Sequence, residues 1–440
     1  MNIALSLFLL TYIGMLVFSQ YKAYLALGMA ALFILLGYSP LFGGTLDPVS
    51  GEPLSSVFSS AMNWNVFMII AGTMIVVSEF IASGMPALLA DWMMSRVSST
   101  KWAIVLLAAF AGIVSAFVDN VATVLIVAPI ALDIAKKTKL SPVPLIVAVS
   151  VFANIQGFAT LVGDTTSVML AGPLYADMNF FDFFIVDGKP GPFFIVQVGT
   201  IAGLITFWFI LGKHNEKISF TQQTKVNDFA PALFLATILI SLVVASFIPN
   251  TPAEINGYLT LGIAFLFVLY RWFFKRKRTA FVDAFSSIDF ETLGLLFGLF
   301  ILIIGLDNQD VILRLGEALE SVGSGDPFVI YTIVILVSVV LSAFIDNIPY
   351  VATLLPVMMR VGENIGGLGF PPYLLLFGLL AGATLGGNLT PIGASANIAG
   401  IGFLKKHGFK VSFMDFFKIG FPITLSALLT GYVLIYFIYS

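Results

Sequence analysis

Two Asp-Asn pairs, Asp119-Asn120 and Asp346-Asn347, lie in the middle of long apolar runs. A charge in apolar surroundings is costly, so an acid at membrane depth indicates a functional site. Carboxylate and amide oxygens are the hard ligands that a cation such as Na⁺ prefers. A buried carboxylate can also bind a proton, because desolvation disfavours its charged form. The two pairs therefore predict two Na⁺ or H⁺ half-sites that together form one binding site.

A third acid, Asp164, lies in a second kind of apolar run, one that glycine and threonine interrupt. The equivalent position in the second half of the chain is Ala394, so we expect the two half-sites to differ in charge. Asp164 could alternatively serve only as the cap of the helix that follows it.

Small polar side chains near the interruptions offer further oxygen ligands, although such residues also hold membrane helices together. They are Thr160, Thr390, Asn388, Ser395 and Asn397. No Lys or Arg lies in these segments. The acids therefore favour a cation, a proton or a neutral solute, and an anion could bind only beside a cation or at a helix N-terminus.

The composition requires these residues to lie in a membrane. The chain has 440 residues, of which 59% are hydrophobic and 10% charged, and this excludes an ordinary soluble protein. Cysteine is absent, and the two histidines, His214 and His407, lie in charged loops. We therefore expect no Cys or His metal site and no cofactor other than the coupling ion, H⁺ or Na⁺.

Eight apolar runs are long enough to be transmembrane helices. They cover residues 3–19, 23–39, 64–83, 193–211, 231–248, 258–274, 290–306 and 420–438. Four other regions are interrupted. Residues 102–136 and 329–362 are broken by the Asp-Asn pairs into halves too short to span, which predicts re-entrant hairpins with the acids at their tips.

The other two interrupted regions, 143–176 and 371–403, predict helices that unwind near the midplane. The glycines expected to permit the unwinding are Gly157, Gly163, Gly387 and Gly393.

The two halves of the chain repeat each other. The hairpin tips match at an offset of 227 residues and the unwound segments at 230. The predicted fold is an all-α polytopic membrane protein with two repeats, 1–213 and 231–440, joined by a cytoplasmic linker at 214–230. Each repeat has five transmembrane helices and one hairpin. Five crossings end the first repeat on the opposite side of the membrane from its start, so the second repeat must be inverted.

Basic residues predict the orientation. With both termini outside, all Lys and Arg except Lys189, Arg314 and Arg360 fall on the cytoplasmic side. The first hairpin then opens to the cytoplasm and the second opens outward. This predicts a multi-pass protein of the plasma (inner) membrane.

Inverted repeats with broken helices are the architecture of secondary active transporters. Our leading prediction is Na⁺/H⁺ antiport by alternating access. The alternative is an H⁺- or Na⁺-coupled permease for a small oxyanion or carboxylate, such as arsenite or citrate. A channel is a further class. We expect the partners to be a small ion or small-molecule substrate and the lipid bilayer, with no nucleic acid.

An intramembrane aspartyl protease also needs two membrane acids, and it is the one enzyme class that the acids suggest. Against it, residues 161–164 lack the first glycine of the usual Gly-x-Gly-Asp motif, and the two tip acids belong to duplicated hairpins. We therefore predict that the protein is not an enzyme.

The Asp-Asn tips, the Gly-Asp-Thr-Thr-Ser motif at 163–167 and the long motif at 386–397 resemble the ion transporter superfamily. The closest resemblance is to the branch of arsenite permeases, the melanosomal P protein, D-type sodium–proton antiporters and citrate-transporter-like permeases. It covers nearly the whole chain. It implies a homodimer with scaffold and transport domains, and binding of ions and substrate between the tips and the unwound helices.

The tips depart from the dicarboxylate branch, which carries Ser-Asn-Thr where this chain has 119–121 (Asp-Asn-Val) and 346–348 (Asp-Asn-Ile). The P-protein branch tends to have paired prolines after its Gly-Asp. Here Thr165 and Thr166 follow, which is nearer the sodium–proton antiporter pattern.

Overall fold

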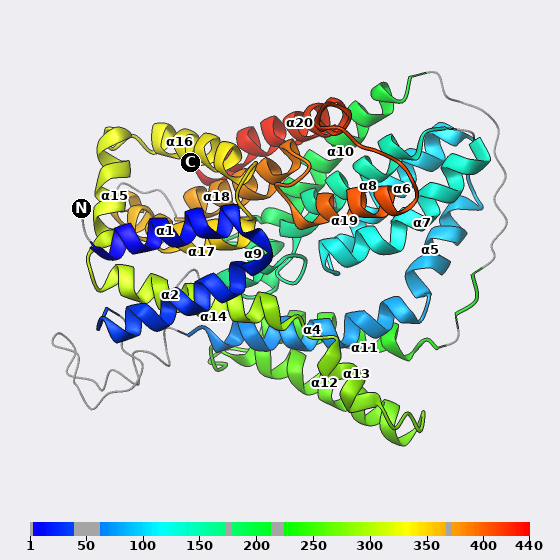
Figure 1. Cartoon of the computed structure of the whole chain (residues 1–440), viewed down its shortest axis with the longest axis horizontal. Coiled ribbons are helices and arrows are strands. Elements are labelled where there is room, and N and C mark those ends of the chain that lie inside the picture. Colours follow the sequence, from blue (N-terminus) through cyan, green and yellow to red (C-terminus); the bar gives the residue numbers. More distant parts are fainter. Residues whose placement is uncertain are drawn as a thin grey trace.

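The computed structural model describes residues 3–38, 62–138, 140–171, 178–212, 224–226, 228–366 and 372–440. Most of the predicted linker, and residues 172–176 of the first predicted broken helix, lie outside these ranges. The described chain is an assembly of packed helices (Figure 1), with one short antiparallel strand pair, β1 (Ile185–Val186) and β2 (Lys189–Pro190).

The helices of the first half follow in this order: α1 (Ile3–Val17), η1 (Ser19–Tyr21), α2 (Lys22–Leu35), α4 (Trp64–Ala82), α5 (Met85–Met94), α6 (Thr100–Ser115), α7 (Asn120–Thr138), α8 (Pro142–Gln156), η2 (Gly157–Ala159), α9 (Thr165–Val168), η3 (Met169–Ala171), η4 (Phe181–Phe183) and α10 (Pro192–Ile210). Those of the second half are α11 (Ala230–Ala245), α12 (Ile255–Phe273), α13 (Ala280–Ser286), α14 (Phe290–Asp307), α15 (Val311–Val322), α16 (Pro327–Ser342), α17 (Asn347–Gly366), α18 (Tyr373–Gly386), η5 (Gly387–Leu389), α19 (Ser395–Lys406) and α20 (Phe413–Tyr439).

Six of the described helices are long and apolar enough to cross a membrane, or seven if the bent pair α15–α16 counts as one span. They are α4, α8 with η2, α10, α12, α14 and α20. Other segments in which we predicted a crossing, among them α1, α2 and α11, form shorter apolar helices. The ten crossings therefore stay a prediction.

The last helix begins earlier than its apolar run. α20 starts at Phe413, ahead of the predicted 420, because Ser412 and Asp415 form a capping box. The Ser412 Oγ accepts a hydrogen bond from the Asp415 amide at 3.1 Å, and the Asp415 carboxylate accepts one from the Ser412 amide at 3.0 Å. A search for apolar residues alone could not detect this polar first turn.

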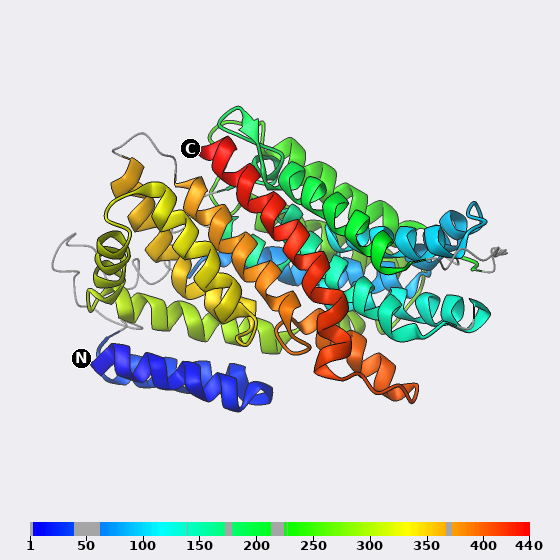
Figure 2. The same cartoon turned by 90° about the horizontal axis from the view of Figure 1, so that it is seen from above.

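Each predicted hairpin region folds as two helices joined at an Asp. α6 and α7 meet at residues 116–119, and α16 and α17 meet at 343–346. The two pairs lie in opposite halves of the molecule, with the joins toward its centre (Figure 2). The inverted relation of the repeats to a membrane stays a prediction.

The two broken helices unwind in the same way. α8 continues into η2 and α18 into η5, and the next residue, Thr160 or Thr390, is extended, with ψ of 163° and 157°. The residue before each new helix, Asp164 or Ala394, is extended again. The predicted interruptions therefore lie where the helices end.

Glycines allow the broken helices to approach the hairpin tips. A Cβ on Gly163 would lie 2.6 Å from the Gly157 carbonyl oxygen and 2.9 Å from that of Ala116. A Cβ on Gly393 would meet the equivalent oxygens, of Gly387 and Ala343, at 2.6 and 2.8 Å. Because these contacts are with backbone, neither position accepts a side chain without displacing the tip.

The outer helices pack in matching pairs, α4 against α12 and α2 against α14. A partly buried ion pair links the helices of the first pair. Arg271 of α12 donates to Glu79 of α4, and Asp283 of α13 lies 3.6 Å from the same guanidinium. The hydrogen bond from Lys277 holds the pKa of Asp283 below its usual range, so this carboxylate is charged at neutral pH.

Candidate functional site

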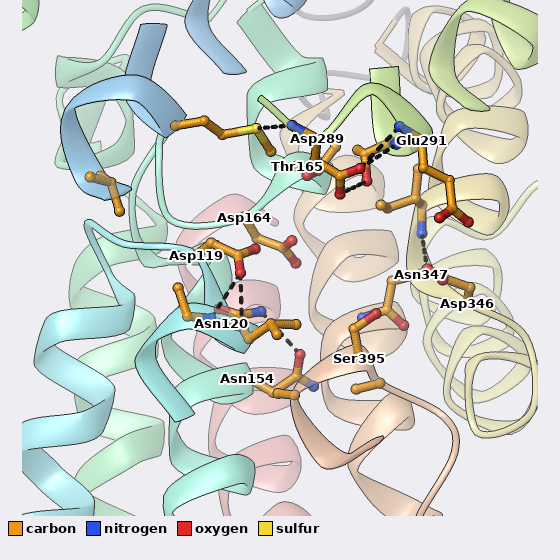
Figure 3. A pocket seen from close by; sticks show the side chains of 18 of the residues that line it. Asp119, Asn120, Asn154, Asp164, Thr165, Asp289, Glu291, Asp346, Asn347 and Ser395 are labelled. Atoms are coloured by element: carbon orange, nitrogen blue, oxygen red, sulfur yellow. Dashed lines mark hydrogen bonds between the residues drawn. The ribbon is translucent and has the colours of Figure 1, made fainter. Parts of the chain in front are cut away.

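A cavity of about 380 Å³ lies where the two hairpin tips meet the two broken helices (Figure 3). Its wall comes from both halves of the chain. Five carboxylates line it: Asp119, Asp164, Asp289, Glu291 and Asp346. Of the other predicted site residues, Asn120, Asn347 and Ser395 also line the cavity.

Asp119 and Asp164 form the acidic first half-site. The Asp119 Oδ1 caps α7 by accepting hydrogen bonds from the amides of Val121 and Ala122 at 2.9 and 3.1 Å. Asp164 precedes α9, and its Oδ2 accepts a hydrogen bond from the Thr166 hydroxyl at 3.0 Å. The two carboxylates come from different elements and lie near each other at the cavity (Figure 3).

The second half-site is different, because Asp346 is paired. The Lys22 Nζ lies 2.6 Å from the Asp346 Oδ2 and donates to it. Lys22 begins α2, and in sequence it is 324 residues away. The expectation of a site without a basic residue was therefore wrong, since the tertiary fold brings this ammonium to the tip.

Sequence reasoning also missed Asp289 and Glu291, which lie at the start of α14. Asp289 caps that helix, accepting from the amides of Glu291 and Thr292 at 3.0 and 3.1 Å. A signal was available, because Glu291 is an acid inside the apolar run 290–306. Asn154, in the last turn of α8, lines the cavity and was missed as well.

Asn154 is the centre of a buried amide chain that joins the two halves of the chain at the cavity wall. Its Oδ1 accepts a hydrogen bond from the Asn120 Nδ2 at 3.3 Å, and its Nδ2 donates to the Asn388 Oδ1 at 3.1 Å and to the Thr384 carbonyl at 2.7 Å. Asn120 in turn accepts from Ser115 at 2.6 Å. Asn388 is fully buried and is not among the residues that line the cavity.

Replacing Asn154 with Leu should therefore destabilise the protein. The substitution leaves the Asn120 and Asn388 amide groups without this partner, and an unsatisfied buried polar group costs about 1–3 kcal/mol. We expect a clearly lower melting temperature in detergent, measured by the loss of monodisperse protein on heating. The control is Asn364→Leu, which removes an amide hydrogen-bonded to Glu320 at the surface. Equal melting temperatures for the two variants would contradict a structural role for the chain.

Three other predicted ligands donate hydrogen bonds to backbone carbonyl oxygens and do not line the cavity. The hydroxyls of Thr160 and Thr390 donate to the carbonyl oxygens of Ala116 and Ala343, one in each hairpin join. Asn397 donates to the carbonyl oxygens of Gly387 and Thr390 at 3.0 and 3.1 Å. All three side chains are buried and fasten the broken helices, so they shape the site from outside it.

The lining charges define what the cavity can hold. Against five carboxylates, Lys22 is the one basic side chain among the described residues of the wall. In the described part of the chain, no three Asp, Glu or His side chains converge as metal ligands. The wall therefore presents its five carboxylates beside amide and hydroxyl oxygens, which are the hard ligands that cations prefer.

Packed membrane helices around a polar cavity, with helix ends at that cavity, define this molecule as a multi-pass membrane transporter. The chain belongs to the citrate transporter family, whose model matches residues 13–367 and 274–440. The comparison therefore indicates a transporter and not an enzyme, as predicted.

Curated relatives agree with this class. The chain is 29% identical over 390 residues to a 46 kDa membrane protein of Mycobacterium leprae, covering 87% of this chain and 88% of the relative. It is also 29% identical over 390 residues to an uncharacterized transporter of Mycobacterium tuberculosis, with 86% and 87% covered. The human P protein is 24% identical over 449 residues, covering 84% of this chain and 53% of that protein. The predicted resemblance is thus confirmed.

Two solved transporters share the fold. The Alcanivorax borkumensis YdaH transporter superposes with a TM-score of 0.59 at 14% identity, covering 96% of this chain and 97% of that chain. Neisseria gonorrhoeae MtrF superposes with a TM-score of 0.57, also at 14% identity, covering 93% and 94%. The prediction of an all-α polytopic membrane protein is confirmed.

Proposed function

We propose that the protein exchanges a monovalent cation, with Na⁺ as the first candidate, for protons by alternating access. Asp119 and Asp164 bind the cation or the proton, and the two compete for the same oxygens. The excess of acids in the cavity is the observation that carries this proposal. Five carboxylates and one ammonium would leave a deeply negative site unless cations or protons occupied it.

Hydrogen bonds between the hairpin tips and the broken helices support alternating access. The tips and the broken helices are linked by buried hydrogen bonds, such as that from Asn120 to Asn154 at 3.3 Å, so they can move as one body. We further propose that the protein is a homodimer in the plasma membrane with both termini outside. The first repeat would then be 1–213, the second 231–440, and 214–230 the cytoplasmic linker.

Cation-induced proton release tests the shared site directly. Purified protein in lightly buffered detergent solution near neutral pH should release protons when NaCl is added, and choline chloride should have no effect. The release follows because Na⁺ displaces protons from Asp119 and Asp164. The double variant Asp119→Asn, Asp164→Asn should release none. No release from the unaltered protein with Na⁺, Li⁺ or K⁺ would contradict the proposal.

A cation-coupled carboxylate permease is the second candidate. Lys22 supplies a basic group at the cavity, and the matching family model describes a citrate transporter. A carboxylate would have to enter with bound cations, because the wall is otherwise acidic. Sodium-dependent uptake of labelled citrate would favour this function over exchange.

A further inference from the structure

We infer that Lys22 acts as a tethered cation at the second half-site, so that only the first half-site is open to a mobile cation. This inference rests on the proposed cation binding and extends it to the number of ions bound. The first half-site carries two carboxylates, Asp119 and Asp164. At the second tip, the one carboxylate, Asp346, is paired with the Lys22 ammonium at 2.6 Å, and Glu291 of α14 lines the cavity beside this pair.

The N-terminal helices bring Lys22 to this depth. At about 1.5 Å per residue, α1 and α2 are each about 22 Å long, short of the roughly 30 Å of a hydrocarbon core. They run as an antiparallel pair from one end of the molecule to near its middle (Figure 2). Phe18 and Tyr21 of the turn between them are exposed, whereas Lys22 at its end reaches the second hairpin join, where its side chain is 20% exposed.

Contacts of α1 hold the pair of helices in this position. The Tyr12 hydroxyl donates to the Pro349 carbonyl oxygen and contacts the Thr353 hydroxyl, both in the first turns of α17. α2 packs along α14, where a Cβ on Gly298 would lie 2.7 Å from the backbone of Ala26. The ammonium is thus delivered by a fixed element to the carboxylate of that hairpin.

The ion pair lies between two cavities. A second cavity of about 400 Å³ lies on the α1 side and is lined by Tyr12 and Gln20. Lys22, Asp346 and Glu291 line both this cavity and the central one. A mobile cation that reached Asp346 from either side would therefore meet an ammonium already bound to the carboxylate.

Charge explains why the two half-sites need different occupants. Without mobile ions, the formal charge of the first is −2, while Asp346 and Lys22 cancel. An ammonium is a compact, strongly hydrated point charge, so it can replace a monovalent cation at one carboxylate. The replacement of Asp164 by Ala394 at the equivalent position belongs to the same asymmetry, because a second acid here would need a second cation.

Equilibrium binding of ²²Na⁺ to the purified full-length protein tests the inference. We expect the Lys22→Met variant to bind one more Na⁺ per chain than the unaltered protein, because Asp346 loses its tethered partner. The double variant Lys22→Met, Asp346→Asn should return to the unaltered number. Lys22→Arg should keep that number, and Lys410→Met is the control for loss of an exposed lysine.

The absence of native cysteine allows a second version of the test. Lys22→Cys alkylated with 2-bromoethylamine regains an ammonium of nearly the original length. It should bind as many Na⁺ as the unaltered protein, whereas blocking the same thiol with a neutral methylthio group should leave the extra Na⁺. If Lys22 had only a structural role, both modified proteins would bind the same number of Na⁺ per chain.

The outcomes separate the inference from the proposed function. Equal Na⁺ numbers for the unaltered protein and Lys22→Met, with binding present in both, would overturn the inference and leave the proposed function standing. Binding only in Lys22→Met would support the inference and contradict a cation site at Asp119 and Asp164. Binding in neither would overturn both.

Discussion

Replacing Asp119 with Asn is expected to abolish cation-dependent proton flux while the protein stays folded. Asn removes the charge but is an equally good helix cap, so the hydrogen bonds from Val121 and Ala122 can persist. Asp119 lines the open cavity, so loss of its charge removes a carboxylate of the proposed site and should lower cation affinity at least about tenfold, or about 1.4 kcal/mol. The measurement is proton flux in proteoliposomes, together with the melting temperature in detergent.

The matched control is Asp133→Asn. Asp133 is an exposed acid of the same helix, α7, and its partner is Lys137 at 2.6 Å. An exposed pair of this kind contributes less than about 1 kcal/mol, so flux should be unchanged. Full flux in Asp119→Asn would remove this residue from the ion site.

Replacing Gly393 with Ala should reduce transport at least tenfold, because the added methyl group has no space between the broken helix and the second hairpin join. The new Cβ would lie 2.6 Å from the Gly387 carbonyl oxygen and 2.8 Å from that of Ala343, so the second hairpin join and the broken helix must separate. Overpacking of this kind costs about 1–3 kcal/mol. We expect a lower melting temperature and at least a tenfold loss of flux, since the separation displaces the cavity wall next to Asp346.

Gly431→Ala is the control for this substitution. Gly431 lies within α20, where nothing comes within 4 Å of an added Cβ. Ala is a better helix former than Gly, so this variant should be at least as stable as the unaltered protein. Normal flux in Gly393→Ala would show that the close approach of broken helix and tip is dispensable.

Local sequence patterns predicted the elements that carry the site. An Asp-Asn pair inside an apolar run marked each hairpin join, and glycines marked each unwound segment. Both signals are local, because a helix cannot continue through a cap or an extended residue such as Thr160. Duplication strengthened them, since each pattern occurred twice at nearly one offset.

The composition of the cavity wall was harder to predict. Lys22 reaches Asp346 only through the packing of α1 and α2 on the second half, which no local pattern records. Asn388 looked like a ligand by spacing, but its amide hydrogen-bonds to Asn154 in the other half of the chain. In both cases the partner lies more than two hundred residues away, so residue type gave the chemistry but not the contact.

Internal pH in proteoliposomes tests the central claim most directly. Vesicles containing the protein and a pH-sensitive dye would receive Na⁺, Li⁺ or K⁺ outside while the membrane potential is clamped. Cation/proton exchange predicts that the interior becomes alkaline with at least one of these cations, and that Asp119→Asn abolishes the change. An internal pH that no cation alters, in vesicles shown to contain folded protein, would contradict the account.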